Sequence, residues 1–157
     1  DPFTSGDFLT DYLDEYNNGT LVLNIKESGI EDYVLEEVKK RGIKSYFLLD
    51  VEFPYLFSAT KKGEKNIAIR FSEKEPIENV LMFKDQLDWV WIDTITKLPI
   101  NKSNQNFLKR FKTCLVCPSR WDRNQEISIY KNRIKTDNLK VDMVMTEEKH
   151  LIEWIKL

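Results

Sequence analysis

The sequence of 157 residues contains one histidine, two cysteines and five glycines, and these small numbers exclude several kinds of site. One histidine cannot provide a histidine acid/base pair. The glycines do not cluster after any predicted strand, so the chain has no phosphate-binding loop, dinucleotide-binding fingerprint or Gly-x-Ser-x-Gly elbow. No group of acidic residues has the spacing of metal ligands. We therefore predict that this chain contains no catalytic and no metal-binding residues.

The two cysteines, Cys114 and Cys117, have the spacing of a redox or zinc half-motif, but both lie in one predicted strand. Strand residues three positions apart point to opposite faces, so these thiols cannot share a metal ion or a disulfide there. We interpret them as buried free thiols in a reducing compartment. We accordingly expect a cytoplasmic protein, with any signal peptide lying before Asp1. The single histidine, His150, is expected on the surface of the last helix.

The chain also lacks a run of about 18 apolar residues, which excludes a membrane-spanning helix. Its formal net charge of −2 gives no general attraction to nucleic acid or to an anionic membrane. A hydrophobic content of 41% and a charged content of 32% are typical of a globular protein with a sizeable core. No linker or low-complexity segment interrupts the sequence, so we predict a single domain over residues 1–157.

Six short segments have the composition of buried strands, and an amphipathic segment follows each at a nearly constant spacing. This alternation predicts an α/β fold with a parallel sheet and right-handed crossovers. Six units are fewer than the eight of a (β/α)₈ barrel, and residues 1–19 predict a loop and a short helix without a preceding strand. We therefore expect an incomplete barrel that lacks its first two strands. The predicted strands are Leu21–Lys26, Ser45–Asp50, Asn66–Phe71, Asp88–Asp93, Thr113–Cys117 and Val141–Thr146.

The helices are predicted from their apolar spacing and from the residues at their ends. Gly42 is expected to end the first crossover helix, and Pro54 and Pro76 to lie near the first turns of the next two. Two further helices are predicted over Asn101–Lys112 and Arg123–Asp137. Thr146 is expected to cap the last helix, with three apolar residues facing inward: Leu151, Ile152 and Ile155.

Polar residues end one face of most predicted strands, at the carboxyl end, where barrel enzymes place their chemistry. Lys and Arg are rarely buried without a partner, so those within apolar strands predict a cationic mouth neutralised by nearby aspartates and suited to an anionic ligand. We predict a ligand-binding site of Asn24, Lys26, Asp50, Arg70 and Asp93. The faces expected to point inward are Val22–Asn24–Lys26, Tyr46–Leu48–Asp50, Ala68–Arg70–Ser72, Trp89–Trp91–Asp93 and Asp142–Val144–Thr146.

Three segments resemble motifs of the glycerophosphodiester phosphodiesterases, which belong to the phosphatidylinositol-phospholipase-C-like group. They are Asp1-Pro2, Leu21–Lys26 and Val141–Thr146. The family has His-Asp-Pro after its second strand, Glu-x-Lys on the third, and Val-Asp-Gly-x-x-Thr-Asp on the eighth. Lys26 matches the lysine of the second motif. Asn24 stands at its metal-binding glutamate, Met143 at the glycine of the third motif, and Glu147 at its final aspartate.

The resemblance implies a metal-dependent (β/α)₈ barrel that hydrolyses phosphodiesters in lipid metabolism. This chain would supply strands three to eight, and the catalytic histidines and metal carboxylates would lie upstream. Within the chain, Lys26 would contact the phosphate, Arg70 would assist, and Asp50 and Asp93 would orient these cations or a substrate hydroxyl. Calcium or magnesium would belong to an intact version, although Asn24 removes one anionic ligand. The chain alone is expected to be inactive.

Two alternatives remain open. A non-catalytic barrel could bind an anionic sugar phosphate or a partner, which the change to Asn24 favours. A self-contained, doubly wound α/β domain would instead place its ligand at a topological switch point. All but the last of these hypotheses share a small phosphodiester or sugar-phosphate ligand. None of them requires nucleic acid or a membrane span.

Overall fold

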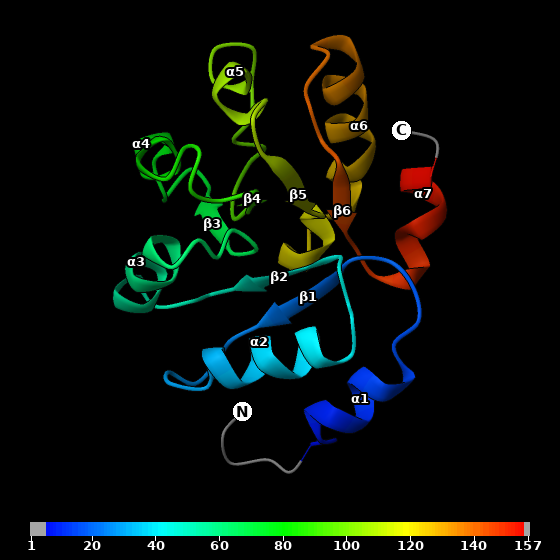
Figure 1. Cartoon of the computed structure of the whole chain (residues 1–157). Coiled ribbons are helices and arrows are strands. Elements are labelled where there is room, and N and C mark those ends of the chain that lie inside the picture. Colours follow the sequence, from blue (N-terminus) through cyan, green and yellow to red (C-terminus); the bar gives the residue numbers. More distant parts are fainter. Residues whose placement is uncertain (1–5, 156–157) are drawn as a thin grey trace.

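The computed structural model describes residues 6–155, in which six parallel strands alternate with helices (Figure 1). Each strand overlaps one of the predicted strand segments, and only β5 extends beyond its segment, by one residue at Lys112, which confirms an α/β fold with parallel strands. The strands are β1 (Leu21–Asn24), β2 (Tyr46–Leu49), β3 (Ala68–Phe71), β4 (Trp89–Ile92), β5 (Lys112–Val116) and β6 (Met143–Met145). The α-helices are α1 (Leu9–Glu15), α2 (Glu31–Lys40), α3 (Phe53–Lys61), α4 (Ile77–Met82), α5 (Gln105–Leu108), α6 (Ile127–Thr136) and α7 (Leu151–Ile155).

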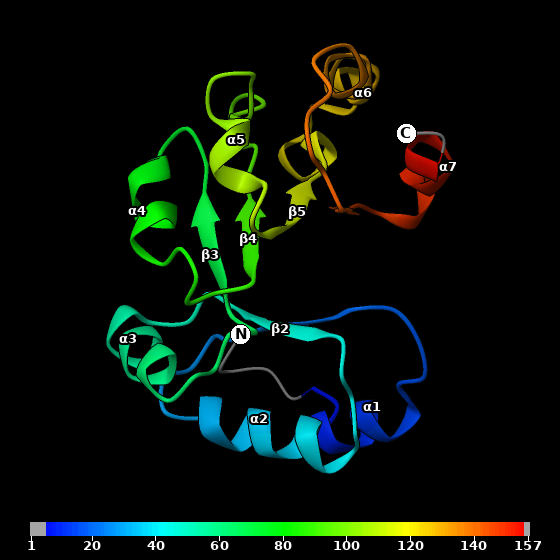
Figure 2. The same ribbon diagram turned by 45° about the horizontal axis from the view of Figure 1, so that its top comes forward.

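The strand order follows the sequence. β1 pairs with β2 in one sheet, and β3, β4, β5 and β6 pair in that order in a second sheet. A single parallel bridge, Leu48 to Ile67, connects the two sheets, and the Leu48 amide donates to the Asn66 carbonyl at 2.9 Å. Helices α2 to α7 lie around the outside of the strands in both views (Figures 1 and 2).

Several helix ends are where the sequence predicts them. Gly42 follows α2 with a φ of 67°, a left-handed conformation that glycine adopts without steric cost. Pro54 lies in the first turn of α3, where a missing amide hydrogen removes no helical hydrogen bond. Pro76 is the residue immediately before α4.

The two predicted helices of the second half are shorter than expected. In the segment Asn101–Lys112 only α5 is helical, because the Asn101 carboxamide accepts a hydrogen bond from the Ser103 amide at 2.9 Å and so forms a turn. In Arg123–Asp137 the α-helix begins only at Ile127. Two 3₁₀ turns, η1 (Pro118–Trp121) and η2 (Asn124–Glu126), lie before it.

The orientation predicted for the last helix is wrong. Thr146 does not cap it, since Glu147 precedes a 3₁₀ turn, η3 (Glu148–His150), that leads into α7. The three residues expected to face inward, Leu151, Ile152 and Ile155, are 48%, 76% and 69% exposed. The buried residue is Trp154, whose indole donates to the Cys117 sulfur at 3.3 Å. The face of α7 that carries Trp154 is therefore the one that packs against the larger cluster.

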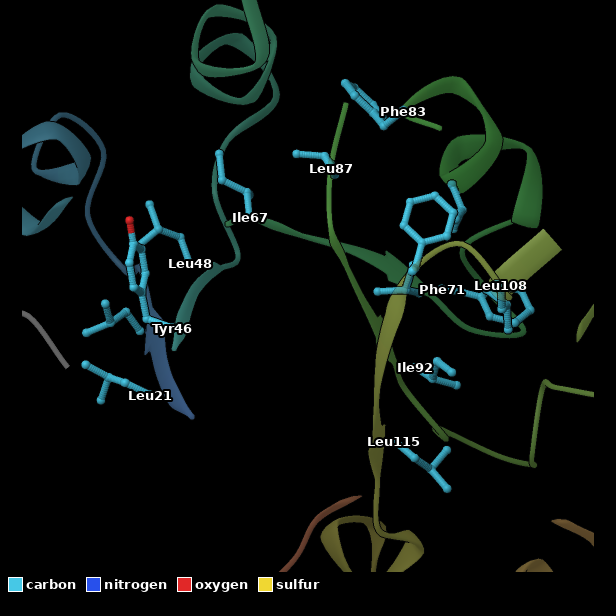
Figure 3. Close-up of a cluster of buried hydrophobic side chains, with 14 of the residues drawn as sticks. Leu21, Tyr46, Leu48, Ile67, Phe71, Phe83, Leu87, Ile92, Leu108 and Leu115 are labelled. Atoms are coloured by element: carbon cyan, nitrogen blue, oxygen red, sulfur yellow. The ribbon is translucent and has the colours of Figure 1, made fainter. Parts of the chain in front are cut away.

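The buried residues form two clusters on opposite faces of the strands. The larger cluster packs the strands against the helices, and Figure 3 shows part of it around Leu48, Ile67 and Phe71. The smaller lies on the other strand face and draws side chains from all six strands. The rings of Phe47 on β2 and Trp89 on β4 lie 4.6 Å apart between centroids there. The residues of the smaller cluster are Phe47, Leu49, Ala68, Trp89, Trp91, Cys114 and Val116, with Val22, Met143 and Met145 packed against them.

Two of the predicted strand faces are reversed. On β2, Phe47 and Leu49 belong to the smaller cluster, whereas Tyr46 and Leu48 pack toward the helices. All four residues of β2 are apolar and buried, so alternation in the sequence carries no signal there. On β6, Met143 and Met145 likewise take the place expected for Asp142, Val144 and Thr146.

Candidate functional site

A cavity of about 410 Å³ lies beside the smaller cluster, where the strands end. All five residues of the predicted site line it. They come from the ends of β1, β2, β3 and β4, so the parallel arrangement brings together residues that are up to 69 positions apart in the sequence, from Asn24 to Asp93. The lining residues are Val22, Asn24, Lys26, Leu49, Asp50, Arg70, Trp91, Asp93, Val116, Arg120, Trp121 and Met145. We call this cavity the main cleft.

Asp50 reaches the main cleft because the backbone leaves the strand conformation at this residue. Regular alternation would place Asp50 on the same face as Leu48, toward the helices. Its φ of 59° is in the left-handed region, which aspartate tolerates better than most residues. The Asp50 carboxylate instead accepts hydrogen bonds from Lys26 Nζ and Arg70 Nη1, both at 2.7 Å.

Arg70 holds three carboxylates together. Its Nη1 donates to Asp50 at 2.7 Å, its Nε to Glu75 at 2.8 Å and its Nη2 to Asp93 at 2.6 Å. Burial alone would lower the pKa of Arg70, but the hydrogen bond that Arg70 donates to Asp50 and the negative charges of Glu75, Asp50 and Asp93 outweigh it and raise the pKa. Arg70 therefore stays charged and fixes the ends of β2, β3 and β4 relative to one another.

Burial and hydrogen bonding also have opposite effects on the pKa of Asp50. Burial would raise the pKa of this carboxyl, whereas the hydrogen bonds from Lys26 and Arg70 hold it below its ordinary value. Asp93 is 4% exposed, and both of its carboxylate oxygens accept hydrogen bonds. One of its oxygens accepts from the Thr94 amide at 2.8 Å and from Trp121 Nε1 at 3.0 Å, and the other accepts from Arg70. These contacts confirm the expectation that aspartates neutralise the cations at the strand ends.

Asn24 and Lys26 are exposed residues of the main cleft. The Lys26 side chain is 63% exposed, and its bond to Asp50 uses one of its three ammonium hydrogens. The Asn24 carboxamide is exposed and makes no hydrogen bond to another residue of the described range. Both groups are therefore open to a ligand that enters the main cleft.

Two further residues of the main cleft, Arg120 and Trp121, were not predicted. They lie in η1, which begins shortly after β5 ends. The expectation that polar side chains at the carboxyl ends of the strands form the site therefore covers them as well. The Arg120 guanidinium lies 5.7 Å from the centre of the Trp121 ring. Within residues 6–155, Arg120 has no carboxylate partner, in contrast to Lys26 and Arg70.

Arg123 connects the loops that carry these residues. It donates to the Thr96 carbonyl at 3.1 Å and to the Tyr130 hydroxyl at 3.0 Å, and it also bonds the Thr94 carbonyl and Glu126. The loop after β4 is thereby attached to the turn that leads into α6. Arg123 does not line the main cleft, so its contribution to the site is positional.

Between residues 6 and 155, no group of three or more histidine, cysteine or acidic residues could hold a metal ion. The two acidic residues that line the main cleft, Asp50 and Asp93, are already bonded to cations of the chain. The carboxylates present therefore do not fit a divalent cation.

The cysteines are free and buried, on opposite faces as predicted. Cys114 belongs to the smaller cluster and Cys117 to the larger. Burial raises the pKa of the Cys114 thiol to about 12. The His150 side chain is largely buried and not on the surface as expected, with Nδ1 at 2.7 Å from Glu153 and Nε2 at 3.8 Å from Glu147. It does not line the main cleft.

No helix in the described part of the chain is both long and apolar enough to cross a membrane. The Asp1-Pro2 segment of the family resemblance lies outside the described residues. Comparison with known proteins found no matching family model, no matching curated protein and no matching solved structure.

Proposed function

We propose that the main cleft binds the phosphate group of a small phosphodiester or sugar phosphate. One observation supports this most strongly: Arg120 at the main cleft has no carboxylate partner among residues 6–155, and Lys26 at the same cleft uses only one of its three ammonium hydrogens on Asp50. An ammonium or guanidinium bonded to a phosphate is among the stronger hydrogen-bonded pairs in proteins. In this proposal Lys26 contacts the phosphate, and Arg70 assists by holding Asp50 and Asp93 in place.

We also propose a barrel of the glycerophosphodiester phosphodiesterase type for the fold. The sequential strand order supports it, because doubly wound sheets reverse their strand order at the ligand site. The location of the main cleft at the carboxyl ends of the strands supports it as well. The doubly wound domain remains the alternative, since parallel strands with helices are common to both.

The proposed reaction is hydrolysis of a phosphodiester, and it needs more than the described residues supply. The single histidine is outside the main cleft, and Asp50 and Asp93 are committed to Arg70. The proposal therefore assigns the acid/base histidines, and the carboxylates for calcium or magnesium, to the part of the family pattern that precedes Asp1. Binding without hydrolysis is the second candidate. It is favoured by Asn24, which stands where the resembling family has a metal-binding glutamate.

The proposal is tested by titrating the chain with sn-glycerol 3-phosphate in a calorimeter. Replacing Lys26→Met should weaken binding about tenfold, as expected for the loss of a hydrogen bond to a charged group. Lys39→Met is a matched control, because Lys39 is similarly exposed and makes a 2.8 Å ion pair with Glu64 outside the main cleft. Affinity within twofold of the parent for Lys26→Met would remove the phosphate-binding role from this residue.

A further inference from the structure

Large apolar side chains are exposed in groups on two surfaces of the chain, both of them away from the main cleft. One surface is a groove between α3 and α4, and the other is one face of α7. Together they contain six of the twelve large apolar side chains that are exposed in residues 6–155. Single exposed apolar residues are ordinary, whereas apolar side chains that gather in one place mark interaction surfaces.

The first surface, which we call the α3/α4 groove, is a hollow of about 240 Å³ with mainly apolar walls. Phe53 and Phe57 lie four residues apart on α3, and Met82 ends α4; each of these side chains is at least half exposed. The buried ring of Phe83 meets that of Phe53 edge-on, with 5.9 Å between the ring centroids. The groove is lined by Phe53, Pro54, Phe57, Met82, Phe83 and Gln86.

The second surface, which we call the α7 face, consists of Leu151, Ile152 and Ile155. Helical spacing brings these residues to one side of α7, away from Trp154, which packs into the larger cluster. All three side chains are exposed, so no described residue covers this face. It is an aliphatic face of a helix, which is the shape that an apolar groove accepts.

The two surfaces are too far apart to meet within one molecule. In both views α3 and α7 lie on opposite sides of the structure (Figures 1 and 2). The α7 face of one copy can therefore reach only the α3/α4 groove of another copy. A helix that lays its apolar face in a groove between two helices is a recurring mode of protein recognition.

The charges beside the two surfaces are opposite in sign. Lys61 lies with its ammonium 4.3 Å from the ring centre of Phe57, and exposed Lys84 follows the end of α4. Neither lysine forms an ion pair with a carboxylate of residues 6–155. On the other surface, exposed Glu148 has no ion pair with a described residue, and the neighbouring Lys149 is already paired with a glutamate at 3.0 Å. The groove therefore offers free cations, and the start of α7 offers a free carboxylate.

We propose that copies of this chain associate head to tail, with the α7 face of one copy seated in the α3/α4 groove of the next. Because the two surfaces differ, each added copy leaves one groove and one α7 face free, so association continues into chains or closes into rings. The contact involves one short helix, so we expect a small interface and a weak association. It does not involve the main cleft and is independent of phosphate binding.

Sedimentation velocity of the full chain over a range of concentrations tests the proposal. The parent should sediment faster as its concentration rises towards the millimolar range. Met82→Glu and Ile152→Glu each place a charge on one surface, at positions 64% and 76% exposed, where the fold tolerates it. Each should weaken self-association about tenfold or more. Phe107→Glu, at an exposed position of α5 that belongs to neither surface, is the control and should behave like the parent.

A mixture of the two variants distinguishes head-to-tail association from a symmetric dimer. Met82→Glu keeps its α7 face and Ile152→Glu keeps its groove, so the mixture should form a complex of one copy of each and nothing larger. Lys84→Glu should weaken self-association at low ionic strength and approach the parent in molar salt, because salt screens exposed charges.

Four results would overturn the proposal. The first is a parent that stays monomeric at millimolar concentration, including one whose groove instead binds vesicles of anionic phospholipid. The second is self-association of Met82→Glu equal to that of the parent. The third is a dimer of Ile152→Glu alone, which would show that two grooves meet each other. The fourth is a mixture of the two variants that forms no complex.

Discussion

Asp50 and Arg70 are 20 residues apart in the sequence, yet their side chains meet at 2.7 Å because Asp50 leaves the strand conformation directly after β2. The left-handed φ of Asp50 turns its carboxylate from the helix side to the main cleft. This backbone torsion therefore gives Lys26 its carboxylate partner and gives Arg70 one of its three. The phosphate-binding proposal depends on this arrangement, since the pairing of Lys26 and Arg70 with aspartates leaves Arg120 as the cation of the main cleft that has no carboxylate partner among residues 6–155.

The pair predicts a specific acid response. The pKa of Asp50 is lower in the folded chain than its ordinary value, so the unfolded chain binds protons more readily. The stabilisation is complete above the ordinary aspartate pKa of about 3.9 and is lost as the pH falls through the lowered folded-state value. Asp50→Asn, which also tolerates a left-handed φ, should reduce the free energy of unfolding at pH 7 by about 1–2 kcal/mol.

Urea unfolding of the parent and of Asp50→Asn from pH 7 down to pH 2.5 measures this response. The difference between the two proteins should shrink as Asp50 becomes protonated. A constant difference over the whole range would show that the charge of Asp50 does not account for the stabilisation.

Arg123 should be important for stability although it does not line the main cleft. Arg123→Met removes the bonds to two loop carbonyls and leaves Glu126 without its ion pair, while it keeps much of the apolar stem. We expect a loss of about 2–3 kcal/mol, since several hydrogen bonds from one charged group are lost together. Arg133→Met is the control, because Arg133 makes only a 3.7 Å contact to Asp137. Equal unfolding midpoints for the two variants would contradict the structural role of Arg123.

Gly42 should tolerate asparagine better than alanine. Its φ of 67° strains any side chain, but nothing lies within 4 Å of an added Cβ, so the cost is conformational and not steric crowding. Gly42→Ala should lower the free energy of unfolding by about 1–2 kcal/mol, the cost of a left-handed residue with a Cβ. Gly42→Asn should cost clearly less, because asparagine adopts this conformation more readily. Thermal unfolding of both variants compares them, and equal losses would count against this account.

Much of the fold could be predicted because the strands and the helix ends have a distinctive local sequence. The six apolar segments and the breaks at Gly42 and Pro54 carry strong local signals, and each strand was found. The faces of β2 could not be predicted, since a strand buried on both sides shows no alternation. The exposure of Ile152 was missed because helical spacing alone does not show which face meets the sheet.

The candidate site could also be predicted in part, from charged residues at the ends of apolar strands. Charged residues at the ends of apolar strands are unusual enough to identify Lys26 and Arg70. The torsion that brings Asp50 to them has no signal in the sequence beyond a residue type that permits it. Arg120 and Trp121 were missed because they lie in a 3₁₀ turn after β5, which was read as part of the connection.

The central claim is that the main cleft binds a phosphate ester, and the indole N–H signals of the tryptophans test it most directly. Trp91 and Trp121 line the main cleft, whereas Trp89 is buried two residues earlier on β4 and does not. In ¹⁵N-labelled protein, sn-glycerol 3-phosphate should shift the Trp121 and Trp91 signals with one common saturation curve and leave Trp89 unchanged. Saturating shifts confined to Trp89, or no shift of Trp121 at millimolar ligand, would contradict the account.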